Sequence, residues 1–461
     1  MEPKMDVLTA IKKSPISRYQ YKVLAACLLV ITIDGFDVFV MGFVLPHLPD
    51  GFFDGNAEKG YLLSAGLAGM AVGSIFLAPL ADRIGRRRLI LWGLVINLAG
   101  LVASAMSPNV EALIAARFVT GIGIGGMAAS LIVLVQEMSS EKRRNTIMGV
   151  YSIGFPLGSL VGGGIGALLV AAFDGAWQVM FVFGAIITAG AVVVTVAMIP
   201  ESVDFLINRN TPEADARIRS FVAKLNNPTI DPNARPALAP VVENNASVRG
   251  LFAGGTYYRT LLTWVMYSCL MSAFYFANTW TPQLVKESSG SADLGTTAGL
   301  ILSFGGLVGA LVFGAWTLKI SAGRLLWTSM AIAAVAILAF ASLFGHPGIA
   351  IALTVAVGLF TYIAITAAAA VVPFLYPVGV RSTAIGWMLG IGRLFSISAP
   401  IAVGYALAVF APQTLYYFSA VPMAVGAVAT YLLWKHTRGE SAPTTAVAES
   451  ISGHPPFVKE G

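Results

Sequence analysis

Two carboxylates lie inside a hydrophobic segment that is long enough to cross a membrane. Asp34 and Asp37 fall within Val23–Val44, whose other residues are almost all apolar. About 20 apolar helical residues match a hydrocarbon core of ~30 Å, and an unpaired carboxylate near its centre costs roughly 2.5–3.5 kcal/mol. Because the two acids are three residues apart, they share a helical face that must meet protein or water. The pattern predicts a proton-binding site on a transport path; a purely structural pair, satisfied by hydroxyls or an arginine, is the alternative.

Two arginines inside other hydrophobic segments are candidate partners for these acids and for an anionic substrate. Arg117 precedes the glycine row Gly121–Gly126, which allows helices to approach closely. We expect Arg117 to pair with Asp34 or Asp37, so that proton uptake responds to the geometry of the pair; snorkelling to the membrane surface is the alternative. Arg393 lies deeper within its segment. It is the expected cation for an anionic substrate group, with a structural ion pair as the alternative.

A basic cluster follows the second hydrophobic segment. The sequence Asp82-Arg83-Ile-Gly85-Arg86-Arg87-Arg88 places a carboxylate before a glycine turn and a run of arginines. We expect a charge latch at the cytoplasmic face, in which Glu137 pairs with Arg83. A positively charged membrane anchor without a latch is the alternative reading.

The composition is that of an integral membrane protein. Of the 461 residues, 57% are hydrophobic and 11% are charged, against about 25% charged residues in soluble proteins. The net charge of +6 does not indicate nucleic-acid binding, because the basic residues lie in short loops between hydrophobic segments. Cys27 and Cys269 each fall inside a predicted span, so no disulfide framework, metal site or cofactor is expected.

Twelve hydrophobic segments are predicted to span the membrane as helices. They cover about residues 21–45, 60–80, 89–106, 112–135, 146–172, 177–199, 259–282, 296–318, 325–344, 349–371, 383–410 and 414–434. They form an N-terminal six-helix bundle, 21–199, and a C-terminal one, 259–434. A tail, 1–20, precedes them, a central loop, 200–258, joins them, and a second tail, 435–461, follows them. The central loop holds a charged helix at Glu213–Lys224, which we expect to lie at the membrane interface.

Orientation and internal symmetry follow from the loops. Lys and Arg gather in the loops on one side, which places these loops, the central loop and both termini in the cytoplasm.

Arg144-Asn-Thr146-Ile-Met-Gly149 and Arg381-Ser-Thr383-Ala-Ile-Gly386 share the pattern R-x-T-x-x-G, each before the fifth span of its half. We assign Arg144 and Arg381 to the predicted cytoplasmic gate. Two parallel six-helix halves are an architecture of secondary transporters, with the site between the halves.

With these features the sequence resembles the major facilitator superfamily along nearly its whole length. Asp82–Arg87 is similar to the cytoplasmic loop signature of that superfamily, although Ala78 stands where a glycine is usual, and Arg117 with its glycine row is similar to the fourth-helix signature. Further segments resemble the aromatic acid:proton symporter family. They are Asp34-Gly35-Phe36-Asp37, Pro200-Glu201-Ser202, Trp280-Thr-Pro282 and the stretch from Tyr376-Pro377 through Gly392-Arg393 to Pro400.

The resemblance implies import of a benzoate-like or hydroxybenzoate-like anion with protons, by alternating access, in the cytoplasmic membrane of a bacterium. The residues that matter in that family fall here on Asp34, Asp37, Asp82, Arg117 and Arg393, with Glu137 as a sixth. We assign proton coupling to the first two acids. The residues assigned to the substrate are Arg393, Arg117, Phe36, Trp280 and Trp387, and those assigned to the cytoplasmic gate are Asp82, Arg83, Arg86, Glu137, Arg144 and Arg381.

Other functions remain as alternatives. A proton-coupled exporter of drugs or metabolites and a symporter of another small organic acid share the same architecture. A receptor built on a transporter scaffold would bind its ligand without moving it. An enzyme is not expected, because the sequence shows no nucleophile–base or metal-binding constellation. The expected partners are a small aromatic carboxylate, protons and the lipid bilayer, the protein being a monomer.

Overall fold

The chain is almost entirely helical. The computed structural model describes residues 7–209, 211–225, 230, 251–252, 257–317, 319–376 and 378–440. Within these ranges, twelve helices are long and apolar enough to cross a membrane. The predicted all-α fold with twelve spans is therefore confirmed. Most of the predicted central loop beyond Leu225, and the predicted tail beyond Glu440, lie outside the described residues.

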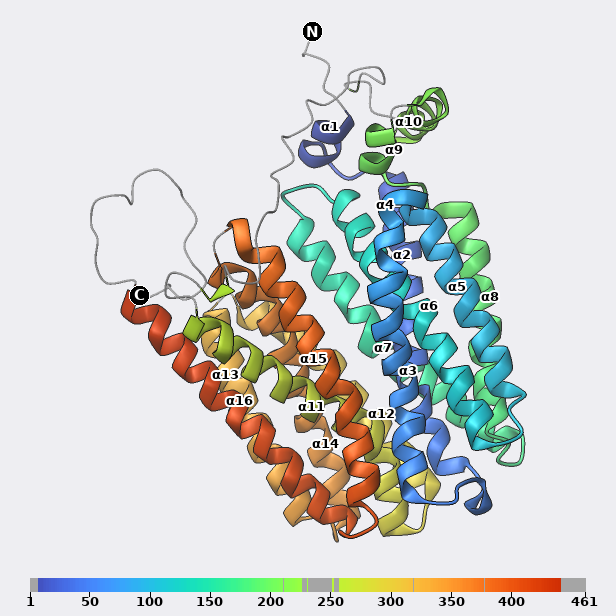
Figure 1. Ribbon diagram of the computed structural model, residues 1–461, viewed down its shortest axis with the longest axis vertical. Coiled ribbons are helices and arrows are strands. Elements are labelled where there is room, and N and C mark those ends of the chain that lie inside the picture. Colours follow the sequence, from blue (N-terminus) through green and yellow to red (C-terminus); the bar gives the residue numbers. More distant parts are fainter. Residues whose placement is uncertain are drawn as a thin grey trace. The chain divides into compact units, whose positions relative to one another are not determined.

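The chain divides into two compact units (Figure 1). Unit 1 comprises the described residues of Met1–Val40 and Ala65–Val242, and unit 2 those of Met41–Ser64 and Glu243–Gly461. The predicted N-terminal bundle, 21–199, therefore differs from unit 1 in the segment Met41–Ser64. This segment joins unit 2 because Gly42 lies against the backbone of Asn278 and Thr279.

Six long helices lie wholly or mainly in unit 1. They are α2 (Arg18–Val44), α3 (Asn56–Phe76), α5 (Arg86–Ala105), α6 (Val110–Glu137), α7 (Arg144–Ala172) and α8 (Gln178–Met198). The Asn109 side chain accepts a hydrogen bond from the Ala112 amide at 3.0 Å and so begins α6. Helices α2 and α7 pack backbone to backbone, because a Cβ on Gly158 would collide with the Thr32 carbonyl group. This close packing fixes which face of α2 looks into the bundle.

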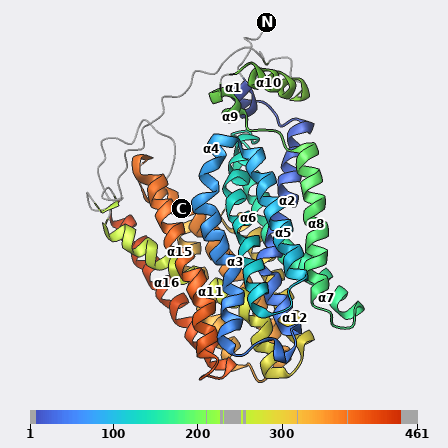
Figure 2. The same cartoon turned by 45° about the vertical axis from the view of Figure 1, so that its right-hand side comes forward.

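Short helices cover one end of unit 1. They are α1 (Val7–Lys13), α4 (Ala81–Ile84), α9 (Val203–Arg209) and α10 (Pro212–Leu225), and Figures 1 and 2 show α1, α9 and α10 lying together. The apolar residues of α10, including Ile218 and Phe221, are buried within unit 1, and the Phe221 ring meets the Tyr19 ring edge to face at 5.8 Å. Protein contacts cover this face of α10, and its position at the membrane interface stays a prediction.

Unit 2 is built around its first long helix. Its helices are α11 (Tyr257–Ser289), α12 (Ala292–Trp316), α13 (Ala322–Ser342), α14 (Pro347–Val371), α15 (Val378–Ala406) and α16 (Pro412–Glu440), and α11 packs against α12, α14, α15 and α16. Among the described residues, short 3₁₀ turns lie at Leu45–His47, Asp50–Phe52, Ala78–Leu80 and Val372–Leu375. Ser291 begins α12 by accepting from the Leu294 amide at 3.3 Å.

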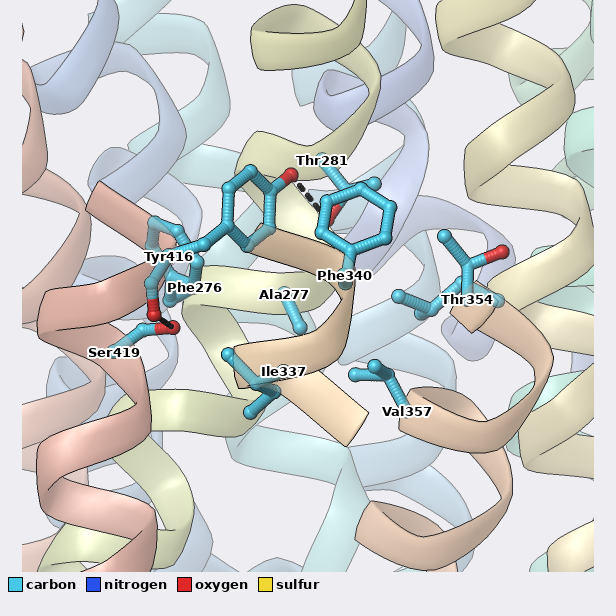
Figure 3. A pocket seen from close by; sticks show the side chains of 10 residues that line it. Phe276, Ala277, Thr281, Ile337, Phe340, Thr354, Val357, Tyr416 and Ser419 are labelled. Carbon is cyan, nitrogen blue, oxygen red and sulfur yellow. Dashed lines mark hydrogen bonds between the residues drawn. The ribbon is translucent and has the colours of Figure 1, made fainter. Parts of the chain in front are cut away.

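The interior of unit 2 contains a small cavity with a largely apolar wall (Figure 3). There the Tyr416 hydroxyl donates to Thr281 at 3.1 Å, close to the rings of Phe276 and Phe340. The cavity volume is about 10 Å³, which is room for a single water at most.

Candidate functional site

A buried ion pair joins α2 to α6 at the centre of unit 1. The Arg117 Nη1 atom lies 2.7 Å from Asp37 Oδ1, and Arg117 Nη2 donates to the Asp37 backbone carbonyl at 2.7 Å. Asp37 is 1% exposed and Arg117 is 2% exposed. The sequence left open whether Arg117 pairs with Asp34 or Asp37, and the structure pairs it with Asp37. A charge-assisted contact of this length is strong where water is excluded.

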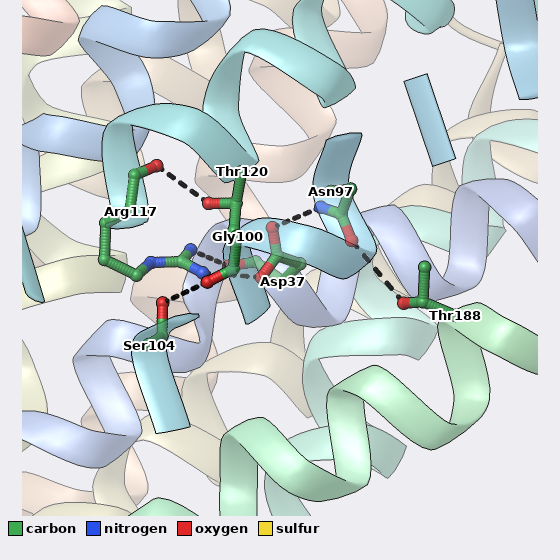
Figure 4. A network of polar contacts seen from close by, with 7 residues as sticks. All are labelled: Asp37, Asn97, Gly100, Ser104, Arg117, Thr120 and Thr188. Carbon is green, nitrogen blue, oxygen red and sulfur yellow. Dashed lines mark hydrogen bonds and ion pairs between the residues drawn. The ribbon is translucent and has the colours of Figure 1, made fainter. Parts of the chain in front are cut away.

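Two uncharged polar residues extend the ion pair across the unit (Figure 4). The Asn97 Nδ2 atom of α5 donates to Asp37 Oδ2 at 2.9 Å, and the Thr188 hydroxyl of α8 donates to Asn97 Oδ1 at 3.5 Å. Sequence analysis did not identify either residue. The available signal was weak, because a single amide or hydroxyl inside a hydrophobic helix is common and often has only local hydrogen bonds.

Close helix packing brings these side chains together. A Cβ on Gly100 of α5 would collide with the Thr120 backbone of α6, and one on Gly123 of α6 would collide with the backbone at Gly93 and Asn97. These glycines therefore allow α5 and α6 to lie in contact, which puts Asn97 within reach of α2. The guanidinium of Arg117 also lies 5.8 Å from the centre of the Phe181 ring.

Asp34 lies one helical turn before Asp37 and is also buried. Its residue exposure is 4%, and its charge lies within electrostatic range of the Tyr151 hydroxyl of α7. Between the two acids, Gly35 lets the backbone of α2 touch the backbone of Phe155. Both carboxylates that the sequence assigned to proton coupling are thus enclosed by unit 1, in one region of α2.

Phe36 does not offer a surface to a ligand in this structure. It is 1% exposed, and its ring meets the Phe183 ring edge to face at 5.6 Å. It also fills the space beside Gly162 of α7 and Gly184 of α8. Phe36 thus has a packing role inside unit 1 here, and its contact with a substrate stays a prediction. Aromatic residues are frequent in every span, so sequence spacing does not separate the two roles.

Arg393 lies on α15 in unit 2 and is half-buried. Within the part of the chain that the structure describes, it forms no ion pair or hydrogen bond, unlike Arg117. The neighbouring Gly392 packs against the ring of Tyr267 of α11, and this tyrosine lies within electrostatic range of Arg393. Arg393 therefore offers an uncommitted guanidinium beside an aromatic hydroxyl.

One face of α15 carries a groove with an aromatic side chain in its wall. The groove has a volume of about 390 Å³, which is enough for a small ligand. Its lining residues recur at helical spacing and are Thr383, Gly386, Trp387, Gly390, Ile391 and Leu394. The Trp387 ring is 44% exposed and stacks on the Trp264 ring of α11 at 5.9 Å, with 25° between their planes. By helical spacing, Arg393 lies on the adjacent face of the same turn as Gly390 and Leu394.

Trp280 lies elsewhere on α11 and is 0% exposed. Its indole Nε1 atom has no hydrogen-bond partner within the described part of the chain. Because a buried indole N–H normally finds an acceptor, this donor is chemically available. Sequence analysis assigned Trp280 to the substrate, and the structure places it in the interior of unit 2, not in the α15 groove.

The predicted cytoplasmic latch has a different partner from the one expected. Glu137 at the end of α6 pairs with Arg86, whereas Arg83 forms no ion pair within the described residues. The reason is the turn at Gly85, which has φ +98° and separates α4 from α5. Arg83 therefore lies exposed on α4 with Asp82, and Arg86 begins α5 on the side that faces Glu137.

Glu201 and Ser202, which follow α8, contact the arginines at the start of α5. Glu201 Oε1 accepts from the Arg87 and Ser202 backbone amides, both at 3.1 Å, and Arg86 donates to the Ser202 hydroxyl. A Cβ on Gly85 would collide with the Glu201 carboxylate. Glu201 and Ser202 carry no role in the site predicted from the sequence.

Of the two arginines that open the repeated R-x-T-x-x-G pattern, the structure describes the side chain of one. Arg144 begins α7 and is half-buried, with an Nε atom that has no hydrogen-bond partner in the described ranges. The side chain of Arg381 lies outside what the structure describes. The part of these two residues in a gate therefore stays a prediction.

Known proteins are similar to this chain over most of its length. The 4-hydroxybenzoate transporter PcaK of Pseudomonas putida is 30% identical over 399 residues, which cover 85% of this chain and 87% of the relative. A gallate transporter of Pseudomonas putida is 29% identical, covering 87% and 89%. The niacin transporter NiaP of Acinetobacter baylyi is 28% identical, covering 95% and 99%.

A solved structure shares the fold at low sequence identity. The xylose transporter XylE from E. coli, in a partially occluded inward-open conformation, superposes with a TM-score of 0.70 and 15% identity, covering 91% of this chain and 98% of that chain. The sequence profile described as the Major Facilitator Superfamily matches residues 27–343 and 263–459. Together with the twelve spans, these matches show a multi-pass membrane transporter and not an enzyme: the chain belongs to the major facilitator superfamily.

Proposed function

We propose that this protein imports small aromatic monocarboxylates, of the benzoate or hydroxybenzoate type, together with protons. The relatives at about 30% identity are named as transporters of 4-hydroxybenzoate and gallate, and they align along more than four fifths of both chains. Both of these substrates are small aromatic acids that combine a planar ring with a carboxylate. We propose a substrate with these two features and leave the ring substituents open.

The observation that carries the proposal is the contrast between the two membrane arginines. Arg117 is occupied by Asp37, whereas Arg393 has no acidic partner among the described residues. A charged side chain within a span is costly unless something compensates it. A substrate carboxylate would supply that compensation through a bidentate contact with the guanidinium. Arg393 is therefore the proposed anion-binding residue, and Arg117 acts through Asp37 rather than on the substrate.

The α15 groove supplies a surface for the ring of the substrate. Trp387 presents a partly exposed aromatic face, held in place by stacking on Trp264. Gly386 and Gly390 leave space above this face, since they carry no side chains. A ring lying against Trp387 would place its carboxylate toward Arg393 on the adjacent helical face. The assignment of Trp280 to the substrate stays a separate proposal, because this residue lies outside the α15 groove and has an unpartnered indole N–H.

Proton coupling is assigned to Asp34 and Asp37. Moving one anion inward against a potential that is negative inside costs ~2.3 kcal/mol per 100 mV, so at least one accompanying proton removes that cost. Both carboxylates are buried, so proton access depends on the alternation of the transporter between its open states. Protonation of either acid changes the charge balance around Arg117.

The proposed orientation places the clustered basic loops and both termini in the cytoplasm of the cell, with the transporter acting as a monomer. The Arg86–Glu137 pair would then close or release the cytoplasmic end of unit 1 during the cycle. The other residues assigned to this gate are Asp82, Arg83, Arg144 and Arg381.

Uptake by purified protein in liposomes tests the proposal. Labelled 4-hydroxybenzoate, benzoate, gallate and nicotinate are offered with an imposed pH gradient, acidic outside. We expect accumulation of at least one aromatic acid that rises as the external pH falls and collapses with a protonophore. Accumulation driven in the opposite direction by the same gradient would instead identify an exporter.

Variants of Arg393 test the anion site. Arg393→Ala should abolish saturable uptake, and Arg393→Lys should weaken substrate binding while retaining some transport, because lysine keeps the charge but not the planar fork. Arg219→Ala, which removes an exposed arginine from α10, is the matched control. Normal uptake by the Arg393→Ala variant would rule out this anion site.

A further inference from the structure

A third helix, α5, supplies a hydrogen-bond donor to the carboxylate of Asp37. The donor is Asn97 on α5, which is 3% exposed and lies 2.9 Å from Asp37 Oδ2. With Arg117 at Oδ1, each carboxylate oxygen has a donor of its own. Figure 4 shows Asn97 between Asp37 and Thr188, on the side of Asp37 away from Arg117.

The orientation of the Asn97 amide is fixed by its two neighbours. An ionised carboxylate only accepts hydrogen bonds, so the Nδ2 group must face Asp37. The carbonyl oxygen then faces α8, where the Thr188 hydroxyl donates to it at 3.5 Å. Thr188 is 0% exposed, so water does not compete for this contact. The hydroxyl therefore favours the amide orientation that serves the charged form of Asp37.

Hydrogen bonds to the charged form of an acid favour that form. Arg117 from α6 is paired with Asp37, Asp34 lies one turn earlier on α2, and Tyr151 from α7 lies within electrostatic range of Asp34. Helices α5 and α8 bring no ionisable side chain to this region and contribute Asn97 and Thr188 instead. Asn97 is thus the uncharged group best placed to set how readily Asp37 takes up a proton.

We infer that Asn97, oriented by Thr188, is a positioning residue that holds the Asp37 carboxylate in its contact with Arg117, and so sets the pH range in which transport responds to protons. This inference rests on the proposed proton-coupled transport. It adds α5 and α8 to the coupling machinery, which the sequence placed on the first span, with Arg117 of the fourth span as partner.

The test is the pH profile of initial uptake in liposomes. Asn97→Ala removes the donor, so the pH of half-maximal uptake should move up by about one unit, because a hydrogen bond to a charged group is lost. Thr188→Val keeps the shape of the side chain but loses the hydroxyl, and should shift the profile in the same direction by less. Thr188→Ser should restore the wild-type profile.

Thr195→Val is the matched control. Thr195 is buried on the same helix, and its hydroxyl has no hydrogen-bond partner in the described part of the chain, so its profile should coincide with wild type. A lower maximal rate with an unshifted midpoint in Asn97→Ala and Thr188→Val would show a merely structural role and overturn the inference. If Asn97→Ala does not accumulate in the membrane, an unshifted Thr188→Val profile overturns it alone. Absence of any pH dependence in the wild-type protein would instead refute the proposed function.

Discussion

Lys59 and Glu287 form an ion pair of 2.8 Å although 228 residues separate them in the chain. Gln283, one turn earlier on α11, donates to the same carboxylate oxygen at 2.9 Å. The side chains of the pair are 17% and 24% exposed, so water screens the interaction only in part. The pair ties the start of α3 to the end of α11 within unit 2. On the same stretch of α3, the Tyr61 hydroxyl is hydrogen-bonded to the hydroxyl of Tyr405 on α15.

Reversing one charge of this pair should destabilise unit 2. Lys59→Glu places two carboxylates side by side, and we expect the free energy of unfolding to fall by about 1 kcal/mol, the upper range for a partly exposed pair. The double variant Lys59→Glu/Glu287→Lys should regain most of that loss. Thermal unfolding in detergent measures both changes, and the difference should shrink at high salt. A double variant that is no more stable than the single one would mean that the pair contributes nothing.

Two glycines of α7 should respond in opposite ways to the same substitution. Gly158→Ala puts a Cβ into the Thr32 carbonyl group, which as backbone cannot move aside, so we expect a loss of about 1–3 kcal/mol. Gly149 has open space at the Cβ position, so Gly149→Ala should be neutral or stabilising by up to about 1 kcal/mol. Unfolding temperatures of the two purified variants check this. Equal losses would show that α2 and α7 do not pack backbone to backbone.

The sequence predicted the charged members of the central network but not its geometry. A carboxylate or guanidinium in a span is so costly that its presence alone predicts a partner. Which acid pairs with Arg117 depends on the rotation of α2, and the glycine contacts with α7 set that rotation. Asn97 and Thr188 bear no charge and carry no comparable cost, so nothing in the sequence distinguishes them from other polar residues in spans.

The charged loop Asp82–Arg88 forms an ion pair that its sequence predicts only in part. Its composition predicted an ion pair with Glu137, and the structure has one, but with Arg86 instead of Arg83. The difference arises from one backbone conformation, the positive φ of Gly85, which turns the chain between two short helical segments. Spacing along the sequence does not reveal such a turn, because glycine is equally compatible with several conformations.

Removing the ring of Trp387 should weaken binding of aromatic acids selectively. In Trp387→Ala we expect the KM for the best aromatic acid to rise about tenfold, since a stacked aromatic contact contributes roughly 1 kcal/mol beyond the buried area. Trp387→Phe should lose much less. Trp92→Ala removes a tryptophan that is 51% exposed in unit 1 and serves as the control. Concentration-dependent uptake gives the KM values, and an unchanged KM in Trp387→Ala would separate the α15 groove from substrate binding.

Asp34→Asn should uncouple transport from protons while leaving exchange of substrate intact. The amide has the size of the carboxylic acid but takes up no proton, so it mimics the protonated state permanently. We expect accumulation under a pH gradient to disappear, because no proton then moves with the anion. Counterflow, in which labelled substrate exchanges for unlabelled substrate without a gradient, should persist. Glu213→Gln, a similar change at an exposed position of α10, should alter neither assay. Near-normal accumulation by Asp34→Asn would remove this acid from the coupling step and leave Asp37 as the sole proposed proton carrier on α2.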